Sequence, residues 1–252
     1  MKLVTLNLWG GRVSDKYKEF FESHKDVDAW FFQEVFKEKN GQPSKMVKQI
    51  VEGFKIEQKL FHVLEKYLPD YENEFCQIHR DTYGLASFIK KDFTVLEKGE
   101  VLIAKGNWDD IEDSQDRDMN RKLQWIEVKV EGRKILIANA HFTHRPEGKR
   151  DSEKRLKQSK IVVDFLNMFD CPKILVGDFN LLPDTESIKI IEETGMRNLV
   201  KDYGVVSTRT SLYKKKLRMA DYVFTSPEIE VLDFKVLPEE VSDHSALYLE
   251  FK

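Results

Sequence analysis

The chain has 252 residues, with 41 Lys and Arg against 44 Asp and Glu, which gives a formal net charge of −3. Hydrophobic residues make up 41% and aromatic residues 12%, a composition that excludes a disordered chain. No apolar run approaches the ~20 residues that a membrane span requires. The balanced charge argues against a protein that holds nucleic acid through overall basicity, and it leaves open an enzyme that handles phosphate at a local site.

Several segments carry patterns that are typical of β-strands. In chain order they are residues 2–8, 29–32, 83–89, 123–130, 134–140, 173–176, 222–224, 228–236 and 246–251. Residues 125–130 alternate between apolar and polar side chains, as expected for a strand with one face toward water. Helical spacing of apolar residues predicts helices over residues 45–67, 152–168 and 184–194, and Gly195 follows the last of these as a C-terminal cap.

The strands occur both in hairpins and in alternation with helices. Residues 131–133 (Glu-Gly-Arg) join two predicted strands and indicate a tight hairpin, whereas other strands are followed by helices. This mixture favours an α/β sandwich over a purely parallel sheet. Because no repeat and no low-complexity linker divides the chain, we expect residues 1–252 to form a single domain.

The two cysteines, Cys76 and Cys171, lie in apolar stretches, where a free thiol behaves as a small core residue. Two cysteines do not make a secreted disulfide framework. The N-terminal apolar run is short and is interrupted by Asn7, without a small-residue cleavage site, so no signal peptide is expected. The interpretation is an intracellular, cytoplasmic protein in a reducing environment.

Polar residues that could act in catalysis or bind a metal ion follow several of the predicted strands. The segments contain Asn7, Glu34, His141, Asp178 with Asn180, and Asp243 with His244, and Asp221 stands at the start of another strand. Each segment alone is an ordinary turn signal. Together they offer carboxylates, amides and histidines, a set that suits Mg²⁺ or Mn²⁺ bound through oxygen ligands, with histidines that transfer protons or contact phosphate. No spacing of Cys and His resembles a zinc site.

In this order, the residues resemble the endonuclease/exonuclease/phosphatase superfamily, which has the deoxyribonuclease I-like fold. The resemblance extends from Asn7 to His244, and Gln33-Glu34, Gly177-Asp178-Phe179-Asn180 and Ser242-Asp243-His244 carry it. It implies a four-layered α/β (α+β) sandwich, with two packed, mostly antiparallel sheets flanked by helices. It also implies hydrolysis of phosphate esters with a divalent metal, usually Mg²⁺.

The resemblance also implies roles for single residues. Glu34 and Asp243 would be the principal metal ligands, with Asn7 close by. Asp178 would orient or deprotonate the attacking water, and Asn180 would hold a phosphate oxygen or the water shell of the metal. His244, oriented by Asp221, would contact the scissile phosphate or act as base, and His141 would stabilise charge or protonate the leaving oxygen on the opposite side. In-line attack needs these groups on two sides of the phosphorus, but the sequence leaves open whether Asp178 or His244 is the base.

Further residues are candidates for substrate contact. His144 and Arg145 lie in a loop after a predicted strand, and Trp9 could stack on a base or sugar. In related enzymes an acid near the position of Asp81 can partner the first histidine. Residues 144–160 and 208–218 carry an excess of basic side chains, and residues 109–118 form an acidic segment. The basic stretches are consistent with a rim for a polyanion, or with solvated faces.

The expected function is a metal-dependent phosphodiesterase or nuclease that acts on DNA or RNA, as a monomer. Abasic-site endonucleases typically have a Tyr at the position of His141, and sphingomyelin hydrolases a His-X-Gln pattern that is absent here. The alternatives are a phosphatase or a lipid or inositol phosphodiesterase of the same superfamily, whose substrate is a phosphorylated small molecule or a lipid headgroup, and a catalytically inactive phosphate-binding module. The sequence does not distinguish endo- from exo-cleavage, or one metal ion from two.

Overall fold

A computed structural model describes residues 1–37, 56–79, 82–106, 119–144 and 148–252. The described residues contain two six-stranded sheets. The first has the order β11 (Val231–Val236), β12 (Leu247–Phe251), β1 (Lys2–Asn7), β2 (Ala29–Phe36), β4 (Tyr83–Lys90) and β3 (Tyr71–His79). The second has the order β5 (Thr94–Ala104), β6 (Arg121–Val130), β7 (Arg133–His141), β8 (Lys173–Asp178), β10 (Asp221–Thr225) and β9 (Arg197–Asn198).

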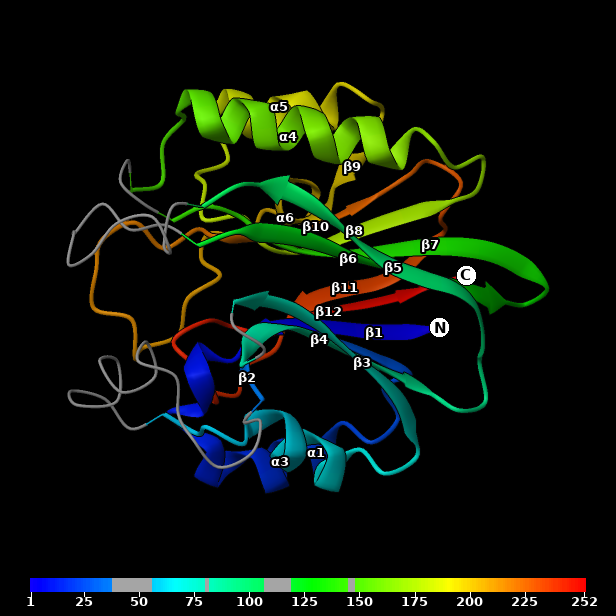
Figure 1. The fold of residues 1–252 in the computed structure, drawn as a ribbon, viewed down its shortest axis with the longest axis vertical. Helices are drawn as coiled ribbons and strands as arrows, with labels where there is room; N and C mark the ends of the chain where they lie inside the picture. The colour runs from blue at the N-terminus through cyan, green and yellow to red at the C-terminus, as the bar shows by residue number, and fades with distance from the viewer. Residues whose placement is uncertain (38–55, 80–81, 107–118, 145–147) are drawn as a thin grey trace.

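Helices cover the outer face of each sheet, so the molecule has four layers (Figure 1). Helices α1 (Tyr17–Ser23) and α3 (Leu60–Tyr67) lie on the first sheet, and α4 (Glu153–Leu166) and α5 (Glu186–Glu192) lie on the second. The short helix α6 (Leu199–Asp202) follows β9. The predicted α/β sandwich is therefore confirmed. None of the helices in the described ranges is long and apolar enough to cross a membrane.

Apolar side chains on alternating strand positions build two cores. Leu3 and Phe31 are buried in the core that includes the second sheet, whereas their neighbours Val4 and Trp30 belong to a core with α1 and α3. This alternation follows from the two-residue period of a strand. Because both faces of the central strands are buried, these strands read as nearly continuous apolar runs in the sequence.

Each sheet contains one parallel pair of strands among antiparallel neighbours. β1 pairs with β2 in parallel, with Asn7 opposite Gln33, and β7 pairs with β8 in parallel, with His141 opposite Asp178. The carboxyl ends of parallel strands meet at the same edge of a sheet. Polar residues at the ends of these four strands are therefore brought together from segments far apart in the sequence.

Several elements differ from the sequence expectation. Of the predicted helix 45–67, residues 45–55 lie outside the described ranges, residues 56–59 are not helical, and α3 forms the remainder. Glu57 N instead donates a hydrogen bond to Gly10 O (2.9 Å), which ties this segment to the turn after β1. Strands β3 and β5 and helix α1 were not predicted. β5 is an edge strand whose side chains are mostly exposed, so the apolar pattern that would identify it is weak.

The other predicted elements agree closely with the structure. α4 begins after Ser152, whose hydroxyl accepts a hydrogen bond from Arg155 N as an N-cap. The predicted strand 228–236 begins only at Val231, because Ile229 N donates to Ser226 O in a turn. Cys76 and Cys171 are free thiols and are buried, as predicted.

Candidate active site

The carboxylate of Asp178, at the end of β8, lies at the centre of the site and is approached by three other polar side chains. Its Oδ2 accepts a hydrogen bond from Asn7 Nδ2 (2.9 Å) and lies 3.6 Å from His141 Nε2 and 3.7 Å from His244 Nε2. Asp178 is only 1% exposed. Residues from β1, β7 and the segment before β12 thus converge on one oxygen atom of β8.

Glu34 lies beside this centre because β2 is irregular at that residue. The pairing of β2 with β4 shifts between Phe32 and Val35, and Glu34 has a φ of 58°. Such a bulge re-aims one side chain, and a non-glycine residue with positive φ persists only where its surroundings hold it. Glu34 Oε1 accepts a hydrogen bond from Asn7 Nδ2 (3.2 Å) and lies 4.0 Å from His141 Nε2.

Gly177 and Asn180 shape the turn that presents Asp178. Gly177 has a φ of 134°, and a Cβ atom there would lie 2.0 Å from the carbonyl oxygen of Ala140 on the parallel partner strand, so only glycine fits. Asn180 has a φ of 53°, and its backbone N–H donates to Asp178 Oδ1 (2.9 Å). Asn180 Oδ1 accepts a hydrogen bond from His144 Nδ1 (3.2 Å). His144 therefore belongs to the rim of the site.

His244 and Asp221 form a buried pair. Nδ1 of His244 lies 2.8 and 3.0 Å from the two carboxylate oxygens of Asp221, and Thr208 Oγ1 donates to Asp221 Oδ2 (2.8 Å). Asp221 opposes Asp178 in the antiparallel pairing of β10 with β8. The carboxylate thus fixes the orientation of the imidazole and leaves Nε2 to face Asp178.

His141 lies on the other side of Asp178 and is 3% exposed. Burial lowers the pKa of His141 well below its usual value, and the Arg121 guanidinium adds to this effect. Its Nδ1 has no hydrogen-bond partner within the part of the chain that the structure describes. Asp81, expected from the resemblance to be this partner, lies outside the described residues.

The ionisation of the two histidines and of Asp178 follows from this arrangement. Burial alone would raise the pKa of Asp178, but the opposing charges, led by His244 and His141, hold it well below its usual value. Burial alone would lower the pKa of His244, but Asp221 raises it above the usual value. Burial raises the pKa of Glu34, against the effects of His244 and of the Asn7 hydrogen bond. The centre thus contains one histidine that favours the charged form and one that favours the neutral form.

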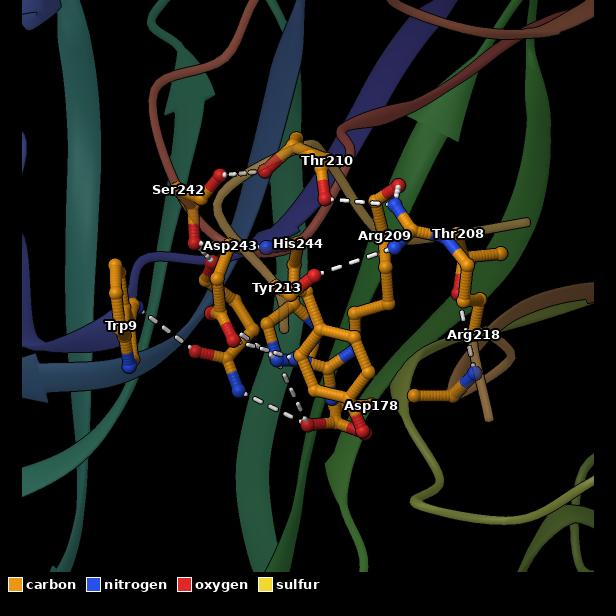
Figure 2. Close-up of polar contacts among 12 residues, drawn as sticks. Trp9, Asp178, Thr208, Arg209, Thr210, Tyr213, Arg218, Ser242, Asp243 and His244 are labelled. Atoms are coloured by element: carbon orange, nitrogen blue, oxygen red, sulfur yellow. Dashed lines mark hydrogen bonds and ion pairs between the residues drawn. The ribbon is translucent and has the colours of Figure 1, made fainter. Parts of the chain in front are cut away.

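Asp243 contacts Arg209, a residue that the sequence analysis included only in a basic stretch. Arg209 Nη1 donates to Asp243 Oδ2 (2.9 Å), and both side chains are buried. Asp243 Oδ1 lies 3.8 Å from His244 Nε2 and has no hydrogen-bond partner among the described residues. Figure 2 shows Asp243, Arg209, His244 and Asp178 in one cluster, with Trp9 at its edge.

Two further substrate candidates have different outcomes. Trp9 follows β1 with a φ of 50°, and its backbone N–H donates a hydrogen bond to Asn7 Oδ1 (2.9 Å). The Arg12 guanidinium lies 4.5 Å from the centre of the indole ring. Trp9 is thus held at the rim by Asn7. Arg145 lies outside the described residues, as does the predicted acidic segment 109–118.

The donor set is suitable for a divalent cation. Among the described residues, ligand atoms of Asp178, Asp221 and His244 lie within 4.8 Å of one another. Asp221 is already engaged by the His244 Nδ1 contact, whereas the orphaned Oδ1 of Asp243 and the carboxylate of Glu34 are oxygen donors that Mg²⁺ prefers. Asn7 presents its amide nitrogen to Glu34 and Asp178 and its oxygen to Trp9 N, an arrangement that holds the two carboxylates in place.

Comparison with known proteins assigns the chain to a family. The family model described as Endonuclease/Exonuclease/phosphatase family matches residues 4–244, and the chain therefore belongs to this family. Its members are hydrolases of phosphoric esters that generally depend on a divalent metal ion. No curated protein matches the chain.

Solved structures of the same fold cover the whole chain at low sequence identity. The mannosyl-6-phosphatase of Bacteroides thetaiotaomicron has a TM-score of 0.73 at 18% identity, over 100% of this chain and 99% of its own. TDP2 of D. rerio in complex with a single-strand DNA product has a TM-score of 0.66 at 16% identity, over 100% and 98%. The human Nocturnin catalytic domain with a bound sulfate anion has a TM-score of 0.66 at 15% identity, over 100% and 93%.

Proposed function

We propose that the protein is a divalent-metal-dependent phosphodiesterase that hydrolyses nucleic acid by in-line attack of water. The observation that carries this proposal is the convergence of two imidazole Nε2 atoms, 3.6 and 3.7 Å away, on the same oxygen of Asp178. Phosphoryl transfer needs a proton acceptor on the side of the water and a proton donor or positive charge on the side of the leaving group. Histidines on both sides of a buried carboxylate can supply these functions.

Glu34 and Asp243 would hold the metal ion, which when bound would supply positive charge to the phosphate oxygens. Asn7 would keep the carboxylates of Glu34 and Asp178 in place through its two amide hydrogen bonds. Either the Asp178 carboxylate or, in the neutral form of the imidazole, Nε2 of His244 would take the proton of the attacking water. Asp221 would hold Nδ1 of His244 so that Nε2 is the atom that exchanges this proton.

His141 and Asn180 would act on the other parts of the substrate. The pKa of His141 is lowered by burial, so this side chain favours the neutral form; with an N–H at Nε2 it would donate a hydrogen bond to the leaving oxygen. Asn180, fixed by its backbone bond to Asp178, would contact a phosphate oxygen. His144 and Trp9 would contact the remaining substrate at the rim, and Arg145 remains a candidate from the sequence alone.

A phosphatase that acts on a small phosphorylated molecule is the second candidate. It is supported by the full-length structural similarity to the mannosyl-6-phosphatase, whereas the similarity to TDP2 with a DNA product supports the first candidate. The two candidates share the catalytic centre and differ in the groups around it. Turnover measured on one panel of oligonucleotides, sugar phosphates, inositol phosphates and sphingomyelin separates them.

The test of the catalytic centre uses purified protein, Mg²⁺ and a labelled oligonucleotide of DNA or RNA. Wild-type protein should cleave it, and Asp178→Asn and His244→Ala should each reduce the rate by about a hundredfold or more, as expected for groups in proton transfer. Asp233→Asn, an exposed aspartate on β11 paired with Lys235, is the matched control and should keep the wild-type rate. Full activity of both site variants would refute the assignment.

A further inference from the structure

Two buried cations lie beside the catalytic centre and have no part in the proton transfers described above. Arg209 is 8% exposed and Lys149 is 5% exposed. Both lie against one aromatic ring, since the Arg209 guanidinium carbon is 4.3 Å and Lys149 Nζ is 5.4 Å from the centre of Tyr213. In Figure 2, Tyr213 and Arg209 lie in the same cluster as Asp178 and His244. The three side chains, Arg209, Tyr213 and Lys149, are called the cation cluster below.

The arginine of this cluster retains an unused donor. Its Nη1 donates to Asp243 Oδ2 (2.9 Å), but its Nε has no hydrogen-bond partner among the residues that the structure describes. Buried polar groups are normally hydrogen-bonded, and an orphaned N–H of a guanidinium indicates a missing acceptor. Guanidinium groups bind phosphate oxygens through paired N–H donors.

The lysine of the cluster also has donor capacity left. Lys149 Nζ donates one hydrogen bond, to Met219 O (2.6 Å), and an ammonium group has three donors. Burial lowers the pKa of Lys149 to about 8, so the side chain is still mostly charged at neutral pH. The neighbouring Arg209 charge also lowers the pKa of Lys149, whereas the carboxylates of Asp178, Asp221 and Asp243 raise it.

Two further arginines fix the loops that carry the cluster. The Arg155 side chain, which is fully buried, donates to the backbone carbonyls of Thr143, His144, Gly148 and Arg150, on both sides of residues 145–147 and next to Lys149. Arg218 donates to the carbonyls of Arg209, Thr210 and Tyr213. The cations of the cluster are therefore preorganised before any ligand binds, which lowers the entropic cost of binding.

We propose that Arg209 and Lys149 form an anion subsite beside the catalytic centre that binds a second phosphate group of the substrate. Arg209 would offer its Nε–H and Lys149 its free ammonium donors to this group, and the Tyr213 ring would pack against the sugar or base that connects it to the scissile phosphate. The subsite gives the enzyme a preference for substrates that carry a phosphate next to the one that is cleaved. This inference rests on the proposed phosphodiesterase function.

The kinetic test compares two dinucleotides with the same scissile phosphodiester, one with an added terminal phosphate at its 5′ or 3′ end. Wild-type protein should have a KM about tenfold lower for one of the phosphorylated forms, the effect expected for one or two hydrogen bonds to a charged group. Lys149→Met should bring the ratio of the two KM values close to one. Lys160→Met, an exposed lysine on α4, is the matched control and should keep the wild-type ratio.

The binding test does not depend on turnover. Inorganic phosphate is titrated calorimetrically into metal-free protein in EDTA, after thermal unfolding has shown that each variant is folded. Lys149→Met and Arg209→Gln should weaken binding by about tenfold, and Lys160→Met should bind as wild type. Equal phosphate binding by wild type and Lys149→Met, or equal KM values for the dinucleotides in the wild type, would overturn the subsite. Weakened phosphate binding without hydrolysis of any dinucleotide would support the subsite and refute the proposed function.

Discussion

Asp221 holds Nδ1 of His244 at 2.8 Å, and this contact turns the other nitrogen of the imidazole toward the catalytic carboxylate. Because Nδ1 is engaged, Nε2 is the atom that lies 3.7 Å from Asp178. The carboxylate and the imidazole come from the start of β10 and from the segment before β12, so the pairing of β10 with β8 is part of the catalytic geometry.

The raised pKa of His244 makes the stability of the fold depend on pH. The folded protein binds this proton more tightly than the unfolded chain, so the contribution to stability is fully present below about pH 6.5 and is lost as the pH rises through the higher folded-state value. Urea unfolding in EDTA should therefore give a larger difference between wild type and His244→Gln at about pH 6 than at about pH 9. A difference that is the same at both pH values would contradict the Asp221–His244 pair.

The side-chain amide of Asn7 lies between two carboxylates and donates to both. Replacing it should therefore change the stability of the fold and the response of that stability to Mg²⁺. Asn7→Asp would replace the donor between Glu34 and Asp178 by a further negative charge, and in EDTA it should lower the unfolding free energy by about 2 kcal/mol or more. Added Mg²⁺ should restore part of this loss, because the cation binds the folded state. Thermal unfolding with and without Mg²⁺ measures both effects. A loss that Mg²⁺ does not reduce would argue against a cation beside Glu34.

Gly177 is predicted to tolerate substitution by alanine much less well than Gly132. Gly177→Ala would place a Cβ atom 2.0 Å from Ala140 O at a φ of 134°, so it should destabilise the fold by about 3 kcal/mol or more. Gly132→Ala is the control, since its φ is 85° but no atom lies within 4 Å of the added Cβ, and it should cost about 1 kcal/mol. Chemical denaturation of both variants gives the comparison. Equal costs would be inconsistent with the close approach of β7 and β8.

Arg218 is expected to act on the substrate only through the loop that it fixes. Arg218→Gln removes donors to the carbonyls of Arg209, Thr210 and Tyr213, so the loop should lose its fixed geometry. KM should rise by about tenfold with a smaller change in kcat, because one loop of the binding site is disordered while the centre at Asp178 is kept. Steady-state kinetics on an oligonucleotide measures both constants. A loss confined to kcat would place Arg218 in the chemistry instead.

The sequence predicted the parts of the molecule whose signal is local. The buried central strands, the helix over α4 and the polar residues at strand ends were all identified, since continuous apolar runs and cap residues are visible in a single sequence. The edge strand β5 is not predicted because its side chains are mostly exposed, and α1 is not predicted because it has only seven residues. Arg209 and Lys149 appeared only as charges in basic stretches.

These two cations could not be assigned from the sequence because their role depends on tertiary contacts. Arg209 approaches Asp243 only through the packing of the loop after residue 207 against the segment before β12, and Lys149 approaches Tyr213 across two loops. The metal-ligand role of Asp243 was inferred from the resemblance, and the salt bridge that it forms with Arg209 could be found only in the structure.

The most direct measurement is a crystal of the protein soaked with Mn²⁺ and a short oligonucleotide, with the ion located by its anomalous scattering. The proposed mechanism predicts an ion bound by Glu34 and Asp243, with the scissile phosphate between it and the Nε2 atoms of His141 and His244. An ion bound away from Glu34 and Asp243, or a phosphate that contacts neither histidine, would contradict it.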